Sequence, residues 1–119
     1  MISYATEDIL DYGTVAYAIN LAYAELRGYD IQLLSPSNGN LYESRDHRWN
    51  RVKLLLELIS KNESHDYYVW FDTDLIFLDF NFRFEDLIQT YPKANIIISA
   101  ERHAETGVAN TGMLKTTLI

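Results

Sequence analysis

Two aspartates stand at the end of the most apolar run in the chain. Residues Tyr67–Phe71 read YYVWF, which is typical of a strand buried on both faces, and Asp72 and Asp74 follow directly. Carboxylates at the tip of a buried strand lose solvation energy unless a cation compensates them. A hard divalent cation held there can bridge two phosphates and neutralise a departing diphosphate. The D-x-D spacing therefore predicts a metal site; the alternative is that Asp72 caps the next turn and Asp74 is merely solvated.

Composition restricts what such a site can bind. The chain has 119 residues, 48% of them hydrophobic, which is enough for the core of one domain. A balance of 17 acidic against 10 basic residues gives a net charge of −7, so we expect no nucleic-acid partner. There is no cysteine, so a metal must be held by oxygen or imidazole, which favours Mg²⁺, Mn²⁺ or Ca²⁺.

The elements that position the two aspartates alternate between strand and helix. Strands are expected at Ile2–Ala5, Tyr29–Leu34, Tyr67–Phe71 and Ile96–Ala100, the last of them buried. Helical spacing predicts three apolar helix faces, made of Ile19, Ala22, Tyr23 and Leu26, of Val52, Leu55, Leu56 and Ile59, and of Phe84, Leu87, Ile88 and Tyr91.

Two residues indicate where predicted helices end: Gly28 is a stop signal for the first helix and Pro92 for the third. The pattern predicts a single α/β domain whose mostly parallel sheet carries helices on its faces. In such sheets ligands collect at the carboxyl ends of the strands. Asp72, Asp74 and the stretch after the first strand, Ala5–Asp8, all fall there.

Three segments, in order, resemble a known family. They are HRWNRVKLLLELI (His47–Ile59), YYVWFDTDLIFLDFNFRFEDL (Tyr67–Leu87) and GVANTGMLKTT (Gly107–Thr117). The chain is similar in these segments to the galactosyl-, mannosyl- and xylosyltransferases of glycosyltransferase family 34. That resemblance implies the Rossmann-like GT-A fold of nucleotide-diphospho-sugar transferases. It also implies transfer of a hexose or pentose from a nucleotide sugar to a glycan hydroxyl.

The resemblance assigns roles to individual residues. Asp72 and Asp74 match the D-x-D motif that binds Mn²⁺ or Mg²⁺ and, through it, the diphosphate of a donor such as a UDP- or GDP-sugar. The remaining matches are Tyr4, Ala5 and Thr6 for the base and ribose, Arg51 or Lys53 for a basic group that reaches the nucleotide, and Asn110, Thr111 and Gly112 for the sugar or acceptor site.

Some parts that the family implies are not found in this sequence. A third metal ligand and the acceptor site are expected from a later half, and His103 comes too early to be given that role. We therefore expect residues 1–119 to be one domain truncated at its C-terminus, inactive by itself, with the apolar run Met113–Ile119 left without a partner. A Golgi location and a membrane anchor in the full-length protein are expected from the family alone.

Two other functions remain open. A phosphotransferase of the haloacid dehalogenase type also has D-x-D after a buried strand, with the first aspartate as nucleophile. That class has Thr or Val two positions beyond the second Asp, where this chain has Ile76. The other alternative is a non-catalytic domain that binds a glycan or a nucleotide.

Overall fold

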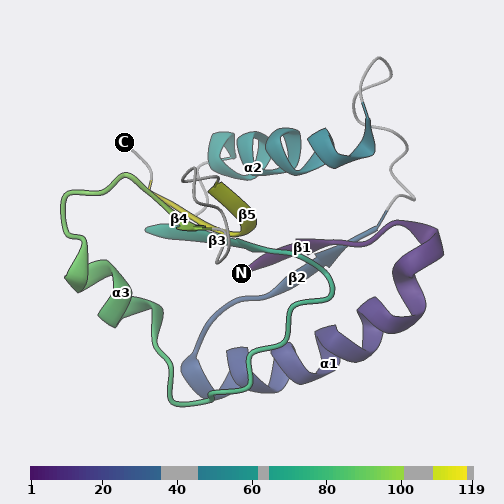
Figure 1. Cartoon of the computed structure of the whole chain (residues 1–119), viewed down its shortest axis with the longest axis horizontal. Coiled ribbons are helices and arrows are strands. Elements are labelled where there is room, and N and C mark those ends of the chain that lie inside the picture. The colour runs from purple at the N-terminus through teal and green to yellow at the C-terminus, as the bar shows by residue number, and fades with distance from the viewer. Residues whose placement is uncertain (36–45, 62–64, 101–108, 118–119) are drawn as a thin grey trace.

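Five strands form one sheet in the order β2-β1-β3-β5-β4 (Figure 1). The computed structural model describes residues 1–35, 46–61, 65–100 and 109–117, with side chains in these ranges except at His47 and from Ala100 onward. The strands are β1 (Ile2–Tyr4), β2 (Gln32–Leu34), β3 (Tyr67–Phe71), β4 (Ile96–Ala100) and β5 (Ala109–Thr117). The helices are α1 (Leu10–Arg27), α2 (Asn50–Ser60) and α3 (Phe84–Thr90), and single 3-10 turns, Glu7–Ile9 and His47–Trp49, precede α1 and α2.

Strand direction confirms the predicted class. β1 pairs in parallel with both β2 and β3, whereas β5 is antiparallel to its neighbours β3 and β4. All strands but β5 therefore run the same way. The expectation that the run from Met113 has no partner is wrong, because Met113 pairs with Phe71 and Thr116 pairs with both Tyr68 and Ile96. Apolar content predicts a strand, but it does not predict insertion between two earlier strands.

β3 is covered on both faces, as its sequence predicts. Tyr68 and Trp70 pack with Leu54 and Leu58 of α2 on one face. On the other face Val69 and Phe71 belong to a cluster completed by Tyr23, Phe77 and Phe84. Figure 1 shows α2 on one side of the sheet and α1 and α3 on the other. This double burial fixes where β3 ends, and so where the D-x-D segment begins.

The apolar face predicted for the first helix is wrong. Only Tyr23 of its four residues is buried, while Leu26 is 64% and Ile19 37% exposed. The side of α1 that faces the protein is made of Gly13, Ala16, Asn20, Tyr23 and Ala24. Part of it is small or polar because it meets the backbone of the segment after β3, which needs hydrogen-bond partners more than apolar cover.

The second helix and the last predicted strand are right in position and partly wrong in burial. In α2, Leu55 is buried as expected, but Val52 and Leu56 are exposed. β4 has the predicted bounds, yet Ile96 is 57% and Ile98 43% exposed because this strand lies at the edge of the sheet.

The predicted helix ends are confirmed. Gly28 ends α1 in the left-handed region (φ 72°) and donates its N–H to carbonyls of the last turn. The third helix ends at Thr90, shortly before Pro92. Within the described ranges, no helix is long and apolar enough to cross a membrane.

Candidate functional site

The D-x-D segment leaves the sheet with its two carboxylates outward and its middle residue inward. Asp72 and Asp74 are exposed, whereas Thr73 is only 6% exposed. A turn follows at once, because the N–H of Leu75 donates to the backbone oxygen of Asp72 at 3.0 Å. Because Thr73 is buried while its two neighbours are exposed, both carboxylates face solvent at the carboxyl ends of the parallel strands.

Thr73 fixes this segment to β1 and α1. Its hydroxyl donates to the backbone oxygen of Tyr4, and the Ser3 hydroxyl donates to Thr73 Oγ1 at 3.4 Å. Its methyl group lies against Gly13 of α1, where an added Cβ would stand 2.4 Å from Thr73 Cγ2. Any side chain at position 13 would thus push on the residue between the two aspartates.

Polar side chains of α1 hold the chain after the D-x-D segment. Asn20 is fully buried; its amide nitrogen donates to the Leu75 oxygen at 2.8 Å, and its amide oxygen accepts from the Phe77 N–H at 3.0 Å. Further along, the Tyr23 hydroxyl donates to the Phe82 oxygen at 3.1 Å and Arg27 Nε donates to the Phe80 oxygen at 2.8 Å. Sequence reasoning missed Asn20, although a polar residue between Ala16 and Tyr23 on one helix face was a usable signal.

A cleft of about 230 Å³ opens beside the two aspartates. It contains five residues that the sequence assigned to a donor site, namely Tyr4, Thr6, Arg51, Asp72 and Asp74. Thr73 also lines it, together with residues the sequence did not single out: Ile9, Tyr12, Arg48 and Trp70. Segments far apart in the chain, the end of β1, the start of α2 and the end of β3, meet there.

Charges in the cleft are of both signs. Arg51 Nη1 lies 3.9 Å from Asp72 Oδ1, and the Trp70 indole N–H donates to the same oxygen at 3.4 Å. Arg51 is partly buried, with 27% of its side chain exposed, and its Nε donates to the Arg48 backbone oxygen. Arg48 in turn forms a close ion pair with Asp46, 2.9 Å away. The cleft thus offers guanidinium groups for an anion beside carboxylates for a cation.

Tyr4 is oriented by a residue that sequence reasoning also missed. The amide nitrogen of Asn50, a fully buried residue at the start of α2, donates to the Tyr4 hydroxyl at 3.2 Å. A buried amide bound to a phenol restricts both side chains, so one face of the cleft is preformed.

Other predicted site residues lie outside the cleft lining. Ala5 is fully buried, its N–H donates to the Leu34 oxygen, and it does not line the cleft. Lys53 is on α2 but does not line the cleft. Asn110, Thr111 and Gly112 open β5; since Met113 pairs with Phe71, they continue past the end of β3 at the edge where Asp72 lies. His103 falls outside the described residues.

The two carboxylates suit a hard metal ion in part. Among the described residues, no group of three or more His, Asp or Glu side chains is arranged to hold a metal. Asp72 and Asp74 would therefore supply two oxygen ligands to a hard divalent ion such as Mn²⁺ or Mg²⁺, and the remaining ligands would have to come from elsewhere. The nearby Arg51 fits the same interpretation, because it can share the negative charge of a bound diphosphate.

No protein-family model matches the chain, and no curated protein matches it in sequence. Among solved structures, it is similar to the crystal structure of a glycosyltransferase involved in the glycosylation of the major capsid of PBCV-1. The match has a TM-score of 0.71 at 16% identity and covers 98% of this chain. This chain spans 59% of that protein's length. The predicted fold class, an α/β fold of the glycosyltransferase type, is confirmed.

Proposed function

We propose that this chain is the donor-binding part of a metal-dependent glycosyltransferase that moves a hexose or pentose from a nucleotide sugar to a glycan hydroxyl. One observation carries the proposal: Asp72 and Asp74 share a cleft with Arg51 and Tyr4 at the carboxyl ends of the parallel strands. The structural similarity of the chain to a solved glycosyltransferase supports the proposal. The narrower assignment to family 34, and with it a Golgi location and an anchored full-length protein, rests on the sequence resemblance alone.

The carboxylates and the guanidinium have separate tasks in this proposal. Asp72 and Asp74 hold a divalent ion, which supplies Lewis-acid stabilisation of the departing nucleoside diphosphate. Arg51, which lies 3.9 Å from Asp72, would contact a phosphate oxygen of the donor, and Asp72 would then be available to the metal. The task of the carboxylates requires Thr73 to stay anchored, because this residue fixes the segment between them to β1.

The rest of the cleft orients the donor. The Tyr4 ring, held by Asn50, forms a wall for the base and ribose, and Thr6 lies next to it. Asn110, Thr111 and Gly112 are proposed to line the sugar or acceptor side because they extend β5 along the same edge. The acceptor is a glycan.

Calorimetry tests the proposal. Titration with UDP and with GDP is expected to show binding that depends on Mn²⁺ and disappears in Asp74→Ala, while the fold remains intact by circular dichroism. Asp86→Ala is the matched control. It removes an exposed carboxylate from α3 that does not line the cleft, so this variant should bind nucleotide normally. Equal nucleotide affinity in the presence of a chelator would refute the metal-dependent site.

Product analysis separates the alternatives. Incubation of the full-length protein with UDP- and GDP-sugars plus glycan acceptors should release the nucleoside diphosphate if the protein is a transferase, and no product forms if it only binds. Residues 1–119 by themselves are expected to bind the nucleotide without releasing product. Trapping of an aspartyl-phosphate on Asp72 would instead identify the phosphotransferase chemistry.

A further inference from the structure

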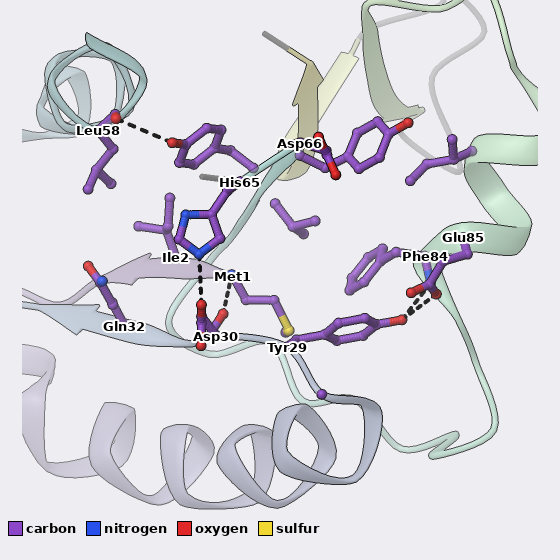
Figure 2. Close-up of a pocket in the computed structure, with 15 residues that line it drawn as sticks. Met1, Ile2, Tyr29, Asp30, Gln32, Leu58, His65, Asp66, Phe84 and Glu85 are labelled. Atoms are coloured by element: carbon purple, nitrogen blue, oxygen red, sulfur yellow. Dashed lines mark hydrogen bonds and ion pairs between the residues drawn. The ribbon is translucent and has the colours of Figure 1, made fainter. Parts of the chain in front are cut away.

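The two ends of β3 differ in the polar groups that surround them. At its start lies a second cavity of about 280 Å³, whose lining includes Gln32 and Glu85 (Figure 2). Two carboxylates of this cavity have partners within the chain. Asp30 Oδ2 lies 2.7 Å from His65 Nε2, and Glu85 Oε2 accepts from the Tyr29 hydroxyl at 2.6 Å. At the end of β3, in contrast, a buried donor reaches the D-x-D cleft, and its acceptor is one of the proposed metal ligands.

This donor comes from the face of β3 that meets α2. Trp70 packs toward α2, and Phe71 belongs to the cluster on the opposite face of the sheet. Successive side chains of a strand point to opposite faces, so Asp72 returns to the side of Trp70, and Thr73 to the other side. The closeness of Thr73 to Gly13 of α1 agrees with this alternation. Asp72 therefore follows Trp70 on the α2 side of the sheet.

Trp70 is fixed in the core. Its side chain is only 4% exposed and packs with Leu54 and Leu58 of α2. Its backbone pairs with Leu114 of β5. Two residues earlier, the Tyr68 hydroxyl donates to the Leu58 backbone oxygen at 3.3 Å, the bond drawn at Leu58 in Figure 2, which ties β3 to the same helix. Close packing keeps a side chain in one rotamer, so the core sets the direction of the indole N–H.

Two nitrogen donors approach the same oxygen of Asp72. The Trp70 indole N–H donates to Oδ1 at 3.4 Å, and Arg51 Nη1 lies 3.9 Å from that atom; neither contact is made with Oδ2. The two donors differ in their freedom to move. Arg51 has a long, partly exposed side chain and, in the proposed function, turns to a phosphate. Trp70 is held by the core, and its indole nitrogen can only donate, so it stays with Oδ1.

We propose that Trp70 is a positioning residue, whose N–H holds Oδ1 of Asp72 so that this carboxylate binds a divalent ion through Oδ2 alone. This role rests on the proposed function, because it takes a metal site at Asp72 and Asp74 as its premise. Binding through one oxygen suits the octahedral shells of Mg²⁺ and Mn²⁺, whereas Ca²⁺ takes more oxygen ligands and often both oxygens of one carboxylate. The hydrogen bond from Trp70 therefore makes the site prefer the smaller ions.

NMR of the whole chain tests this role, because two tryptophans give two indole N–H signals. Mg²⁺ and Ca²⁺ are the probes, each added with and without UDP. Binding of Mg²⁺ should move the indole signal of Trp70, whose acceptor belongs to a metal ligand. The signal of Trp49 should move less, because Trp49 does not line the cleft. The titrations also give both affinities, and the unmodified chain should bind Mg²⁺ more tightly than Ca²⁺.

Trp70→Phe removes the indole N–H and keeps an aromatic ring in the core. Its Mg²⁺ affinity should fall about tenfold, as for loss of one hydrogen bond to a charged group, whereas its Ca²⁺ affinity should fall at most about threefold. The preference for Mg²⁺ should therefore shrink, which a general loosening of the fold would not produce. Trp49→Phe is the matched control and should keep both affinities.

Three results would overturn the role of Trp70. They are a Trp70 indole signal that stays in place when Mg²⁺ binds, an unmodified chain that binds Ca²⁺ as tightly as Mg²⁺, and the same ratio of the two affinities in Trp70→Phe. The first two are measured on the unmodified chain, so they hold even where Trp70→Phe does not fold.

Failure of the proposed function looks different. Mg²⁺ binding that is lost in Asp74→Ala but unaffected by Trp70→Phe refutes the role of Trp70 alone. Mg²⁺ binding that persists in Asp74→Ala, or no binding with or without UDP, overturns the metal site and the role of Trp70 with it.

Discussion

At the scale of single residues, the middle position of the D-x-D segment matters as much as the aspartates. Thr73 is buried and hydrogen-bonded to β1, so it sets the direction in which Asp72 and Asp74 leave the sheet. In the proposed metal site, removal of one carboxylate would take away one ligand, whereas loosening of Thr73 would misdirect both carboxylates at once.

Arg51 and Lys53 provide a matched pair for testing the proposed basic group that would reach the nucleotide. Both are on α2, but only Arg51 lines the cleft, 3.9 Å from Asp72. Arg51→Gln should weaken nucleoside diphosphate binding about tenfold, as expected for loss of one charge-assisted contact. Lys53→Gln should change it little. Calorimetry in Mn²⁺ measures both variants, and a larger loss in Lys53→Gln would show that the wrong basic residue has been assigned.

Glu85 predicts a pH dependence of stability. Burial alone would raise the pKa of this carboxyl, but the hydrogen bond from Tyr29 and the nearby Arg83 outweigh burial and hold the pKa below its ordinary value of 4.5. A group with a lowered pKa in the folded state stabilises the protein above its unfolded pKa and loses that effect as the pH falls. The free energy of unfolding should therefore decline below about pH 4.5.

Urea unfolding between about pH 7 and pH 3 measures this decline. Glu85→Gln keeps an acceptor for Tyr29 but cannot titrate, so its decline should be smaller. The same pH dependence in both proteins would show that Glu85 contributes nothing to it.

At the scale of elements, α1 supports the cleft beside Asp72 and Asp74. Gly13→Ala would bring a Cβ within 2.4 Å of Thr73 Cγ2, and such overpacking costs about 1–3 kcal/mol of stability. We expect this variant to lose nucleotide affinity as well. Adding Thr73→Ser removes the clashing methyl group but keeps the hydroxyl, so the double variant should recover both properties. Chemical denaturation and calorimetry measure the two effects.

Gly28→Ala is the control for the same helix. It forces a side chain into the left-handed region at φ 72° but meets no neighbour within 4 Å. It should cost about 1 kcal/mol of stability and leave nucleotide affinity unchanged. Equal loss of affinity in Gly28→Ala and Gly13→Ala would mean that helix stability, and not the contact with Thr73, controls the cleft.

The same helix shows where prediction from sequence succeeds and fails. Its end at Gly28 was predictable because the left-handed cap is a local requirement. Its buried face was not, because Asn20, Tyr23 and Arg27 hydrogen-bond the backbone of a distant segment, residues 75–82. Apolar spacing carries no information about such long-range polar support. The exposed Leu26 and Ile19 belong to the face that spacing had selected.

At the scale of the whole molecule, the sheet follows from local patterns except for its last strand. Alternation of strand and helix predicted the parallel strands β2, β1 and β3, and hence that Tyr4 and Asp72 share an edge. The insertion of β5 between β3 and β4 depends on long-range pairing among three strands. The local sequence pattern of β3 or of β4 does not predict that pairing. Arg48, Tyr12 and Asn50 were missed because their contacts exist only after β1 and α2 come together.

Because β4 is an exposed edge strand, we expect the protein to self-associate through it. Ile96 and Ile98 are exposed on an edge strand, and apolar edges pair with other chains. Ile96→Lys should lower self-association without loss of stability, as measured by light scattering and thermal unfolding. Val69→Lys, inside the sheet, should instead unfold the protein. Unchanged association in Ile96→Lys would exclude this edge as its cause.

The central claim is that Asp72 and Asp74 hold a divalent ion beside a nucleotide, and paramagnetic NMR tests it most directly. With UDP or GDP present, a small amount of Mn²⁺ should broaden the backbone amide signals of Thr6, Arg51 and Thr73. Signals of Gln32 and Glu85, around the cavity at the other end of the sheet, should stay sharp. The broadening should vanish in Asp74→Ala. Broadening centred elsewhere, or unchanged in that variant, would contradict the assignment of this cleft.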